Sequence, residues 1–250
     1  MTEVKLLDHG YLKLIERWGT DASIIEAARM STDKGFLGWG PKHHSHCASQ
    51  SPPIETCDCN LDEPGDEKLL AYLYKNSHST PFEFCGMTIE VQAPIFVFRE
   101  WHRHRTQSYN EMSARYTPLP DLNYIPTVER LLVNSKTNKQ AGTVAGASEL
   151  SREGAVQFQE GLYRVYKEQQ ALYERALSMG VPKELARIHL PVGRYSRMRA
   201  TTDLRSWMAF LTLRYAPTAQ YEIRVYAEAM HGLLSQAFPR SMELFDSGKK

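Results

Sequence analysis

The sequence predicts a single α+β domain with a mixed or antiparallel sheet and a long helical region. Residues 83–92 alternate between two sets of side chains with the period of a β-strand. Residues 158–176 instead repeat apolar side chains at the spacing of one helix face. No internal repeat and no convincing interdomain linker divides the chain. We therefore expect residues 1–250 to form one domain, interrupted by an irregular insertion at about 34–66.

The composition is that of a soluble globular protein, with 42% hydrophobic and 24% charged residues in a chain of 250. Thirty basic and 29 acidic side chains give a net charge of +1, so overall charge does not drive binding to nucleic acid or to an anionic membrane. The apolar runs, such as residues 93–98, are far shorter than the roughly 20 residues that a membrane span needs. The first residues lack the features of a secretory signal, so we expect a cytoplasmic protein with free thiols.

The first half of the chain is expected to contain two helices, a strand and a third helix. Asp21 is a good N-cap for a short helix over 22–32. Beyond the insertion, a helix is expected over 67–76, and the predicted strand follows it. Pro94 suits the first turn of a helix over about 94–104. The strand therefore leads directly into a helix, and charged groups gather at the far end of that helix.

The second half is predicted to be mainly helical. The longest helix ends near Gly180 and has one apolar stripe, typical of a core helix or of a helix packed against another subunit. The stripe consists of Phe158, Leu162, Val165, Leu172 and Ala176. An extended segment at 194–202 precedes two more helices, at about 203–213 and 218–237.

The most unusual chemistry lies in residues 101–116, which read W-H-R-H-R-T-Q-S-Y-N-E-M-S-A-R-Y. This stretch combines three arginines and two histidines with hydroxyls, an amide and a carboxylate. Arginine presents a planar fork of donors that matches phosphate, while Ser, Asn and Glu can fix ribose hydroxyls and base edges. The stretch is therefore predicted to form a nucleotide cradle.

A second basic cluster extends over residues 181–215, where seven basic side chains oppose two acidic ones. A phosphate-rich ligand is the natural counter-charge if the two clusters meet in the fold. Two alternatives stay open at this point. One is a solvated charged surface. The other is a nucleic-acid-binding protein that stacks bases on Trp101, Tyr109 and Tyr116.

The insertion contains side chains of the types that bind Zn²⁺. They are His43, His44, His46, Cys47, Cys57 and Cys59. Their spacing fits no standard zinc module, so we expect no metal site and interpret the segment as a loop near the substrate entrance. A metal-dependent hydrolase built on this loop would leave the arginine-rich stretch unexplained.

The segment Arg103-His104-Arg105, followed after seven residues by Ser113, resembles the R-H-R…S signature of the flavin-dependent thymidylate synthases, the ThyX family. It lies within the longer match R-H-R-x-x-S-Y-N-E-x-S-x-R-Y. Further segments resemble the family in the same order. They are residues 78–83, 93–97, 186–191, 204–206 and 213–214. Apart from 34–66 and 134–150, the resemblance covers most of the chain.

This resemblance implies a homotetrameric α+β enzyme that binds FAD at its subunit interfaces. Enzymes of this family make dTMP from dUMP, with methylenetetrahydrofolate as the carbon donor and NADPH as the reductant. Reduced flavin supplies the hydride that completes the methyl group. No cysteine attacks the uracil in this family, so the four cysteines are not expected to be nucleophiles. Neither nucleic acid nor a membrane is then an expected partner.

The family's functional positions can be carried over to residues of this chain. The resemblance implies FAD contacts from Ser31, His78, Thr80, Arg103, His104, Arg105, Glu111, Asp203 and Arg205. It implies dUMP contacts from Glu100, Arg103, Glu111, Ser113, Ala114, Arg115, Arg187 and Arg214. Arg214 matches the catalytic arginine thought to favour ionisation at the N3 side of uracil. A fixed guanidinium there stabilises charge as C5 becomes nucleophilic.

Several positions depart from the family's pattern. They are Phe84 at a frequent His, Glu100 at a usual Gln, Ala114 at a common Gly, and Ala209 and Thr218 at positions that are often Asn and His. Glu100 matters most, because a carboxylate near the dUMP phosphate would repel it unless Arg99 or Arg103 neutralises the carboxylate.

Overall fold

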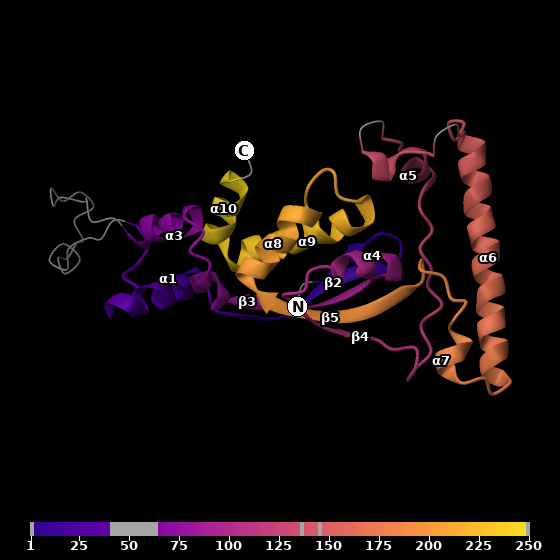
Figure 1. The fold of residues 1–250 in the computed structure, drawn as a ribbon, viewed down its shortest axis with the longest axis horizontal. Helices are drawn as coiled ribbons and strands as arrows, with labels where there is room; N and C mark the ends of the chain where they lie inside the picture. The colour runs from indigo at the N-terminus through magenta and orange to yellow at the C-terminus, as the bar shows by residue number, and fades with distance from the viewer. Residues whose placement is uncertain (1–2, 41–64, 136–137, 145–146, 249–250) are drawn as a thin grey trace, which may run out of the picture. The chain divides into compact units, whose positions relative to one another are not determined.

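The computed structural model describes residues 3–40, 65–135, 138–144 and 147–248. Within these residues, five strands form one sheet in the order β1-β2-β3-β5-β4, of which Figure 1 labels the last four. The strands are β1 (Glu3–Leu6), β2 (Gly10–Trp18), β3 (Gly86–Pro94), β4 (Ser108–Glu111) and β5 (Tyr195–Asp203). In the described residues, helices lie between and after the strands along the chain, so the α+β class is as predicted.

The pairs at the two edges of the sheet are antiparallel. β1 and β2 form a hairpin in which Leu6 lies opposite Gly10. At the other edge, Ser108 of β4 lies opposite Thr201 of β5, and Glu111 lies opposite Met198. This pairing brings the predicted nucleotide cradle beside the second basic cluster.

The chain packs as two compact units. Unit one comprises residues 1–15, 88–201 and 210–230, and unit two comprises residues 16–87, 202–209 and 231–250. Three strands (β2, β3 and β5) pass from one unit into the other, as do helices α8 (Leu204–Arg214) and α9 (Tyr221–Ala237). No linker therefore marks a boundary between the units, and the single domain over 1–250 stays a prediction.

The core of unit one forms around α4 (Ile95–Trp101). The Trp101 ring packs 4.6 Å from the Phe210 ring and 6.2 Å from the Tyr226 ring, measured between centroids. Tyr226 donates its hydroxyl hydrogen to the Gln92 carbonyl at 2.7 Å. A side chain at Gly10 would place Cβ 2.0 Å from that hydroxyl, so this position has room only for glycine.

The core of unit two contains α1 (Asp21–Arg29), α3 (Asp66–Lys75) and α10 (Pro239–Ser247), which contact one another (Figure 1). Asp21 was expected to cap α1, but Thr20 occupies that position, with a backbone in the extended region. The buried Asp21 carboxylate instead accepts the backbone N–H groups of Arg240 and Ser241 at 3.0 and 3.2 Å. It therefore satisfies the first turn of α10, a helix that the sequence analysis did not predict.

The other predicted elements are present, with shifted ends. The strand begins at Gly86 rather than 83 because residues Thr80–Glu83 form a 3₁₀ turn. Pro94 is the N-cap of α4 and not its first helical residue. The helix ends at Trp101 instead of 104, so the R-H-R segment lies in the turn after it. The extended segment and the two later helices correspond to β5, α8 and α9.

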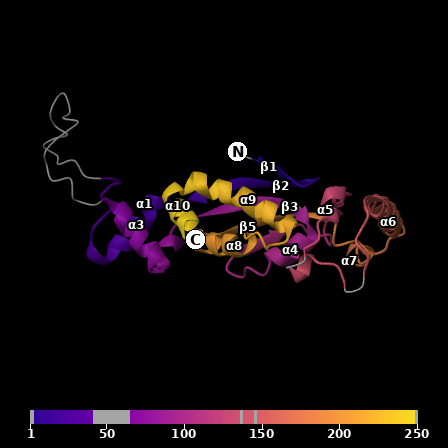
Figure 2. The same cartoon turned by 90° about the horizontal axis from the view of Figure 1, so that it is seen from above.

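The longest helix, α6 (Arg152–Ser178), lies beside α5 (Val128–Leu132) and α7 (Lys183–Ala186) in unit one (Figure 2). Its predicted apolar stripe does not belong to the core of this chain, since Phe158, Val165 and Leu172 are 51%, 46% and 42% exposed. Packing against another subunit is the remaining interpretation of the stripe. Neither α6 nor another helix in the described residues combines the length and the apolar character required to cross a membrane.

Candidate active site

In unit one, Arg214 at the end of α8 is held by two residues from the α4 region, forming a group that we call the Arg214 cluster (Glu100, His104 and Arg214). Arg214 Nη1 donates to Glu100 Oε2 at 2.7 Å, and Nη2 donates to the Glu100 main-chain oxygen at 3.0 Å. Arg214 Nε donates to His104 Nε2 at 3.0 Å. These bonds use three of the five N–H groups and leave one on each terminal nitrogen for a ligand.

His104 in this cluster is a neutral hydrogen-bond acceptor. Burial, reinforced by the nearby Arg214 guanidinium, lowers the pKa of His104 to about 4. Because Nε2 accepts from Arg214, the hydrogen-bond pattern places the ring proton on Nδ1. Protonation of Nε2 would break the bond to Arg214, so the cluster requires neutral His104.

The ion-pair partner of Glu100 is Arg214. From the sequence, Arg99 or Arg103 was named as the cation that could neutralise this carboxylate, and both are closer to Glu100 in the chain than Arg214 is. Burial raises the pKa of Glu100, Arg214 opposes that effect, and Glu222 adds to it. The carboxylate is therefore bound to a cation in surroundings that favour its protonated form.

The R-H-R turn is held in place by a nearby tyrosine. Tyr109 donates its hydroxyl hydrogen towards the main-chain oxygens of Trp101 and His104, at 3.1 and 2.7 Å. With the turn fixed in this way, His104 is half-buried while Arg103 and Arg105 are exposed. These two guanidinium groups are accessible to anionic ligands, as their predicted roles require.

The predicted nucleotide-binding residues after β4 approach α7. Glu111, the last residue of β4, is half-buried. Ser113 Oγ accepts the backbone N–H of Arg115 at 3.3 Å, and Arg115 forms an exposed ion pair with Glu184 of α7 at 3.8 Å. Arg187 directly follows α7. The fold therefore brings Ser113 and Arg115 towards the segment that carries Arg187.

Ala114 is also part of this segment but is 2% exposed. Its side chain is covered by the protein, so any contact with a nucleotide comes from its main chain.

Unit two contains a pocket of about 520 Å³ that includes three of the predicted FAD contacts. His78, Thr80 and Arg205 line it, together with Ala28, Leu73, Ser77, Ser79 and Pro81. Arg205 forms an ion pair with Glu83, which fixes its direction. Hydroxyls, an imidazole and a guanidinium are donors suited to phosphate oxygens, so these residues fit the pyrophosphate of a dinucleotide such as FAD.

Two other predicted FAD contacts have structural partners and do not line this pocket. Asp203 precedes α8 and accepts the Ser206 backbone N–H at 2.7 Å, which is the geometry of an N-cap. Ser31 donates its hydroxyl hydrogen to the Ala28 carbonyl at 3.1 Å. Their predicted contacts with FAD stay predictions.

Three residues that line or support this pocket were not among the candidate site residues predicted from the sequence. Ser77 and Ser79 contribute to its lining, and Glu83 positions Arg205. The signal was available for Ser79 and Glu83, because both lie within the family-like segment 78–83. The pairing of Glu83 with Arg205 joins residues 122 positions apart, so local patterns do not show it.

Of the four cysteines, Cys85 lies in the described residues. Cys85 is fully buried, and burial, together with Asp21 and Asp203, raises the pKa of its thiol to about 12. Such a thiol is not a nucleophile near neutral pH, in agreement with the expectation. The candidate zinc ligands at 43–59 lie outside the described residues, and the described part of the chain contains no metal-binding group of three His, Cys, Asp or Glu side chains.

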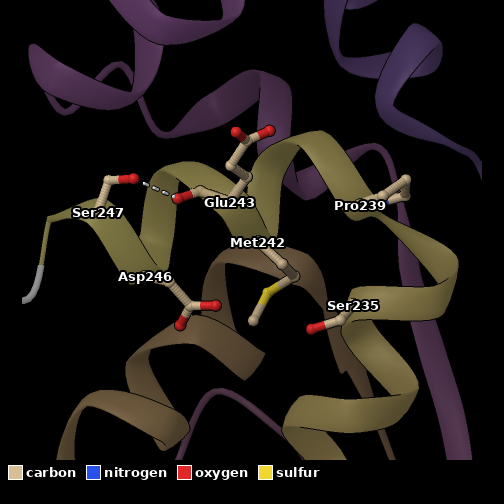
Figure 3. A pocket seen from close by; sticks show the side chains of 6 residues that line it. All are labelled: Ser235, Pro239, Met242, Glu243, Asp246 and Ser247. Atoms are coloured by element: carbon tan, nitrogen blue, oxygen red, sulfur yellow. Dashed lines mark hydrogen bonds between the residues drawn. The ribbon is translucent and has the colours of Figure 1, made fainter.

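A second pocket in unit two, of about 510 Å³, does not suit a nucleotide (Figure 3). It is lined by Ser235, Pro239, Met242, Glu243, Asp246 and Ser247. Two carboxylates and no basic side chain line it, so it would repel phosphate.

Comparisons with known proteins cover nearly the whole chain. The model of the Thy1 family, described as thymidylate synthase complementing protein, matches residues 13–240. The chain is 35% identical over 243 residues to the flavin-dependent thymidylate synthase of Wolbachia pipientis wMel, covering 97% of this chain and 76% of that relative. It is also 35% identical over 243 residues to the enzyme of the same name from Kosmotoga olearia, covering 97% of this chain and 93% of that relative.

The fold is similar to a solved structure as well. The UMP/dUMP methylase PolB from Streptomyces cacaoi, bound with 5-Br dUMP, superposes with a TM-score of 0.74 at 30% identity. The match covers 98% of this chain and 97% of that one. A second structure of PolB, bound with 5-Br UMP, gives the same TM-score and identity.

Proposed function

The chain belongs to the family of flavin-dependent thymidylate synthases, and on this premise we propose that it methylates dUMP at C5 to give dTMP. The carbon comes from methylenetetrahydrofolate, and NADPH is the reductant. FAD, when bound, supplies the hydride that completes the methyl group. The observation that carries the proposal is the Arg214 cluster, which presents a fixed guanidinium with two N–H groups still available.

Arg214 is the residue to which we assign the chemistry on the uracil ring. Its remaining N–H groups can donate to the oxygen and nitrogen atoms at the N3 side of the base. A fixed cation at this edge stabilises the negative charge that the ring acquires as C5 attacks the one-carbon unit. Since Glu100 and His104 already hold the guanidinium, little reorganisation is required when the charge develops.

Binding of the nucleotide is assigned to the exposed cations around the cradle. Arg103 and Arg115 are exposed, and Arg187 follows α7, close to the ion pair between Arg115 and Glu184. Arginine can bind phosphate through two parallel hydrogen bonds, so these side chains are suited to the dUMP phosphate. Glu111, Ser113 and the main chain of Ala114 complete the predicted set.

We assign the pyrophosphate of FAD to the phosphate-compatible pocket of unit two. His78, Thr80 and Arg205 would hold this pyrophosphate. From the family resemblance, Arg103, His104 and Arg105 are predicted to face the cofactor. Glu111, Asp203 and Ser31 are the further predicted contacts. The protein's contribution is to position the cofactor, which carries the redox chemistry.

The proposal includes assembly into a homotetramer in the cytoplasm. The exposed apolar stripe of α6, containing Phe158, Val165 and Leu172, supports self-association, because a contiguous apolar face is normally covered by a partner. A nucleic-acid-binding function is not favoured, since several arginines of the second basic cluster (residues 181–215) are buried or already form ion pairs within the chain. Arg194 is 1% exposed, and Arg199 and Arg214 form ion pairs with Glu90 and Glu100.

The first experiment is the visible absorption spectrum of the purified protein, repeated on the supernatant after denaturation. We expect released FAD at about one molecule per chain, followed by dTMP formation from dUMP, methylenetetrahydrofolate and NADPH. UMP should be assayed beside dUMP, since PolB is named for both nucleotides. A colourless protein that also fails to bind added FAD would overturn the proposal.

A further inference from the structure

Glu100 contacts the Arg214 guanidinium twice, through its side chain and through its main chain. The side-chain contact is an ion pair at 2.7 Å between groups that are 27% and 19% exposed. At this distance the carboxylate cancels much of the positive field of the guanidinium, and limited contact with water makes the effect stronger than on an open surface. Glu100 therefore fixes the direction of Arg214 and reduces its net charge.

We propose that Glu100 is a positioning residue for Arg214 and that its negative charge weakens binding of the pyrimidine nucleotide, so that protonation of Glu100 strengthens this binding. The inference rests on the proposed function, because it assumes that the nucleotide binds at Arg214. It also states what the replacement of the family's usual Gln by Glu100 does to Arg214. A Gln keeps an acceptor for Arg214 but leaves the full positive charge of the guanidinium to the nucleotide.

Two charged side chains from other elements act on the Glu100 carboxylate, Arg214 of α8 and Glu222 of α9. His104, in the turn after α4, binds the same guanidinium through its Nε2. The pKa of His104 is lowered to about 4 by burial and by Arg214, so His104 stays neutral above pH 5. Glu222 is buried, but its hydrogen bonds with Arg130 and Gln220 outweigh that burial and lower its pKa. Of these groups, Glu100 is the acid whose pKa moves from its ordinary value towards the range between pH 5 and pH 8.

The test is calorimetric titration of the FAD-loaded enzyme with dUMP from pH 5 to pH 8. Wild type is compared with Glu100→Gln and with Glu129→Gln, a matched control from an exposed ion pair with Arg152. We expect Glu100→Gln to bind dUMP about 3- to 10-fold more tightly than wild type at pH 8, with the ratio falling as the pH is lowered. The control should follow wild type throughout.

The ratio of the two dissociation constants removes the titration of the dUMP phosphate, which is the same for both proteins. Deoxyuridine, which lacks the phosphate, provides a second probe and should show the same trend. A ratio that does not change with pH, or one equal to that of Glu129→Gln, overturns the role of the Glu100 charge.

The positioning role has a readout that needs no ligand. Glu100→Ala and Glu100→Gln both remove the carboxylate charge, but only Glu100→Ala also removes the side-chain acceptor that holds Arg214. Its bond to His104 should then weaken, so the pKa of His104 should be about 0.5 to 1 higher in Glu100→Ala than in Glu100→Gln in an NMR titration. In Glu100→Gln the pKa should stay low, because the amide oxygen still accepts from Arg214. Equal His104 pKa values in folded Glu100→Ala and Glu100→Gln proteins would overturn the positioning role.

These readouts separate the inference from the function on which it rests. If wild type binds neither dUMP nor deoxyuridine, the proposed function and the effect on affinity both fail, whereas the His104 titration still decides whether Glu100 positions Arg214. If wild type binds dUMP with no dependence on Glu100, only the inference fails.

Discussion

Arg29 donates two hydrogen bonds to one carboxylate oxygen of Asp66, from Nε at 3.0 Å and from Nη2 at 2.5 Å. The other oxygen accepts the backbone N–H groups of Leu37 and Gly38, at 2.7 and 3.1 Å. Asp66 is fully buried and begins α3. The hydrogen bonds of this one carboxylate therefore connect the last residue of α1 and residues 37 and 38 with the first residue of α3.

Replacing this carboxylate by an amide should destabilise the protein. In Asp66→Asn the buried end of Arg29 loses its counter-charge, and we expect a loss of about 3 kcal/mol in the free energy of unfolding at pH 7. Burial would raise the pKa of Asp66, but hydrogen bonds from Arg29, Leu37 and Gly38 outweigh it and lower the pKa. The stabilisation is therefore complete above the unfolded pKa, near 4, and disappears as the pH falls through the folded value.

Urea unfolding of wild type and Asp66→Asn at pH 7 and pH 3 measures this dependence. The difference between the two proteins should be clearly smaller at pH 3. Asp33→Asn, at an exposed position in the same unit, is the control and should change stability by less than about 0.5 kcal/mol. Equal losses at both pH values would contradict the assigned role of the carboxylate.

The segment 41–64 should be removable without loss of the fold. Gly40 donates its N–H to the Glu67 carboxylate at 2.8 Å, and a Cβ added to Gly65 would lie 2.3 Å from the Gly40 carbonyl oxygen. The two residues that flank the segment are therefore adjacent, and a linker of about two glycines can connect them. The entropy cost of closing this shorter loop is smaller than that of the full segment. We expect the melting temperature of the deletion variant to be no lower than that of wild type by more than about 4 °C.

The same junction supplies a contrasting variant. Gly65→Ala places a methyl group against main-chain atoms of Gly40 and should lower the melting temperature by several degrees. A deletion variant that melts well below Gly65→Ala would show that residues 41–64 contribute to the stability of the unit.

Local patterns in the sequence predict the elements whose side chains repeat regularly. The start of α3 was predicted to within one residue, because its apolar periodicity begins immediately after the insertion. The end of α4 was placed too late. Tyr109 bonds the carbonyls of Trp101 and His104 and fixes a turn there, a contact that periodicity does not contain.

In the candidate site, too, local features could be predicted from the sequence, whereas contacts between distant residues could not. The R-H-R…S spacing is local and identified the family correctly. The ion pair between Glu100 and Arg214 joins residues 114 positions apart and depends on where α4 and α8 end. Arg99 and Arg103 are neighbours of Glu100 in sequence, yet the helix turn directs the carboxylate to a cation from another element.

Cys85 should be dispensable for catalysis. In Cys85→Ala we expect dTMP formation within about twofold of wild type, because a buried thiol with its pKa raised to about 12 takes no part in the reaction. The lost sulfur contacts should cost about 1 kcal/mol of stability. Mass spectrometry after iodoacetamide treatment at pH 8 should find Cys85 unmodified in the native protein and modified in urea. A loss of turnover beyond tenfold in a folded variant would contradict this assignment.

A charge placed in the apolar stripe of α6 should disrupt self-association. In Val165→Glu we expect the molar mass from light scattering to fall from that of the proposed tetramer to a smaller species, because a carboxylate enclosed by the proposed subunit contact would have no partner there. Gln157→Glu adds the same charge to an exposed position of the same helix and should leave the mass unchanged. If Val165→Glu keeps the mass of wild type, this stripe is not the contact surface.

Arg214→Lys should separate the catalytic role of the guanidinium from its contribution to the fold. Lysine retains the positive charge, but its ammonium group cannot bond Glu100 and His104 and still present two parallel donors to a planar base. We expect dTMP formation to fall by about 10² to 10³, the usual effect of losing one transition-state donor, while bound FAD and the melting temperature change little. Arg224→Lys, in an ion pair between half-buried Arg224 and exposed Glu228, is the matched control and should retain wild-type turnover. Near-normal dTMP formation by Arg214→Lys would remove Arg214 from the chemistry and leave it as a structural residue at the end of α8.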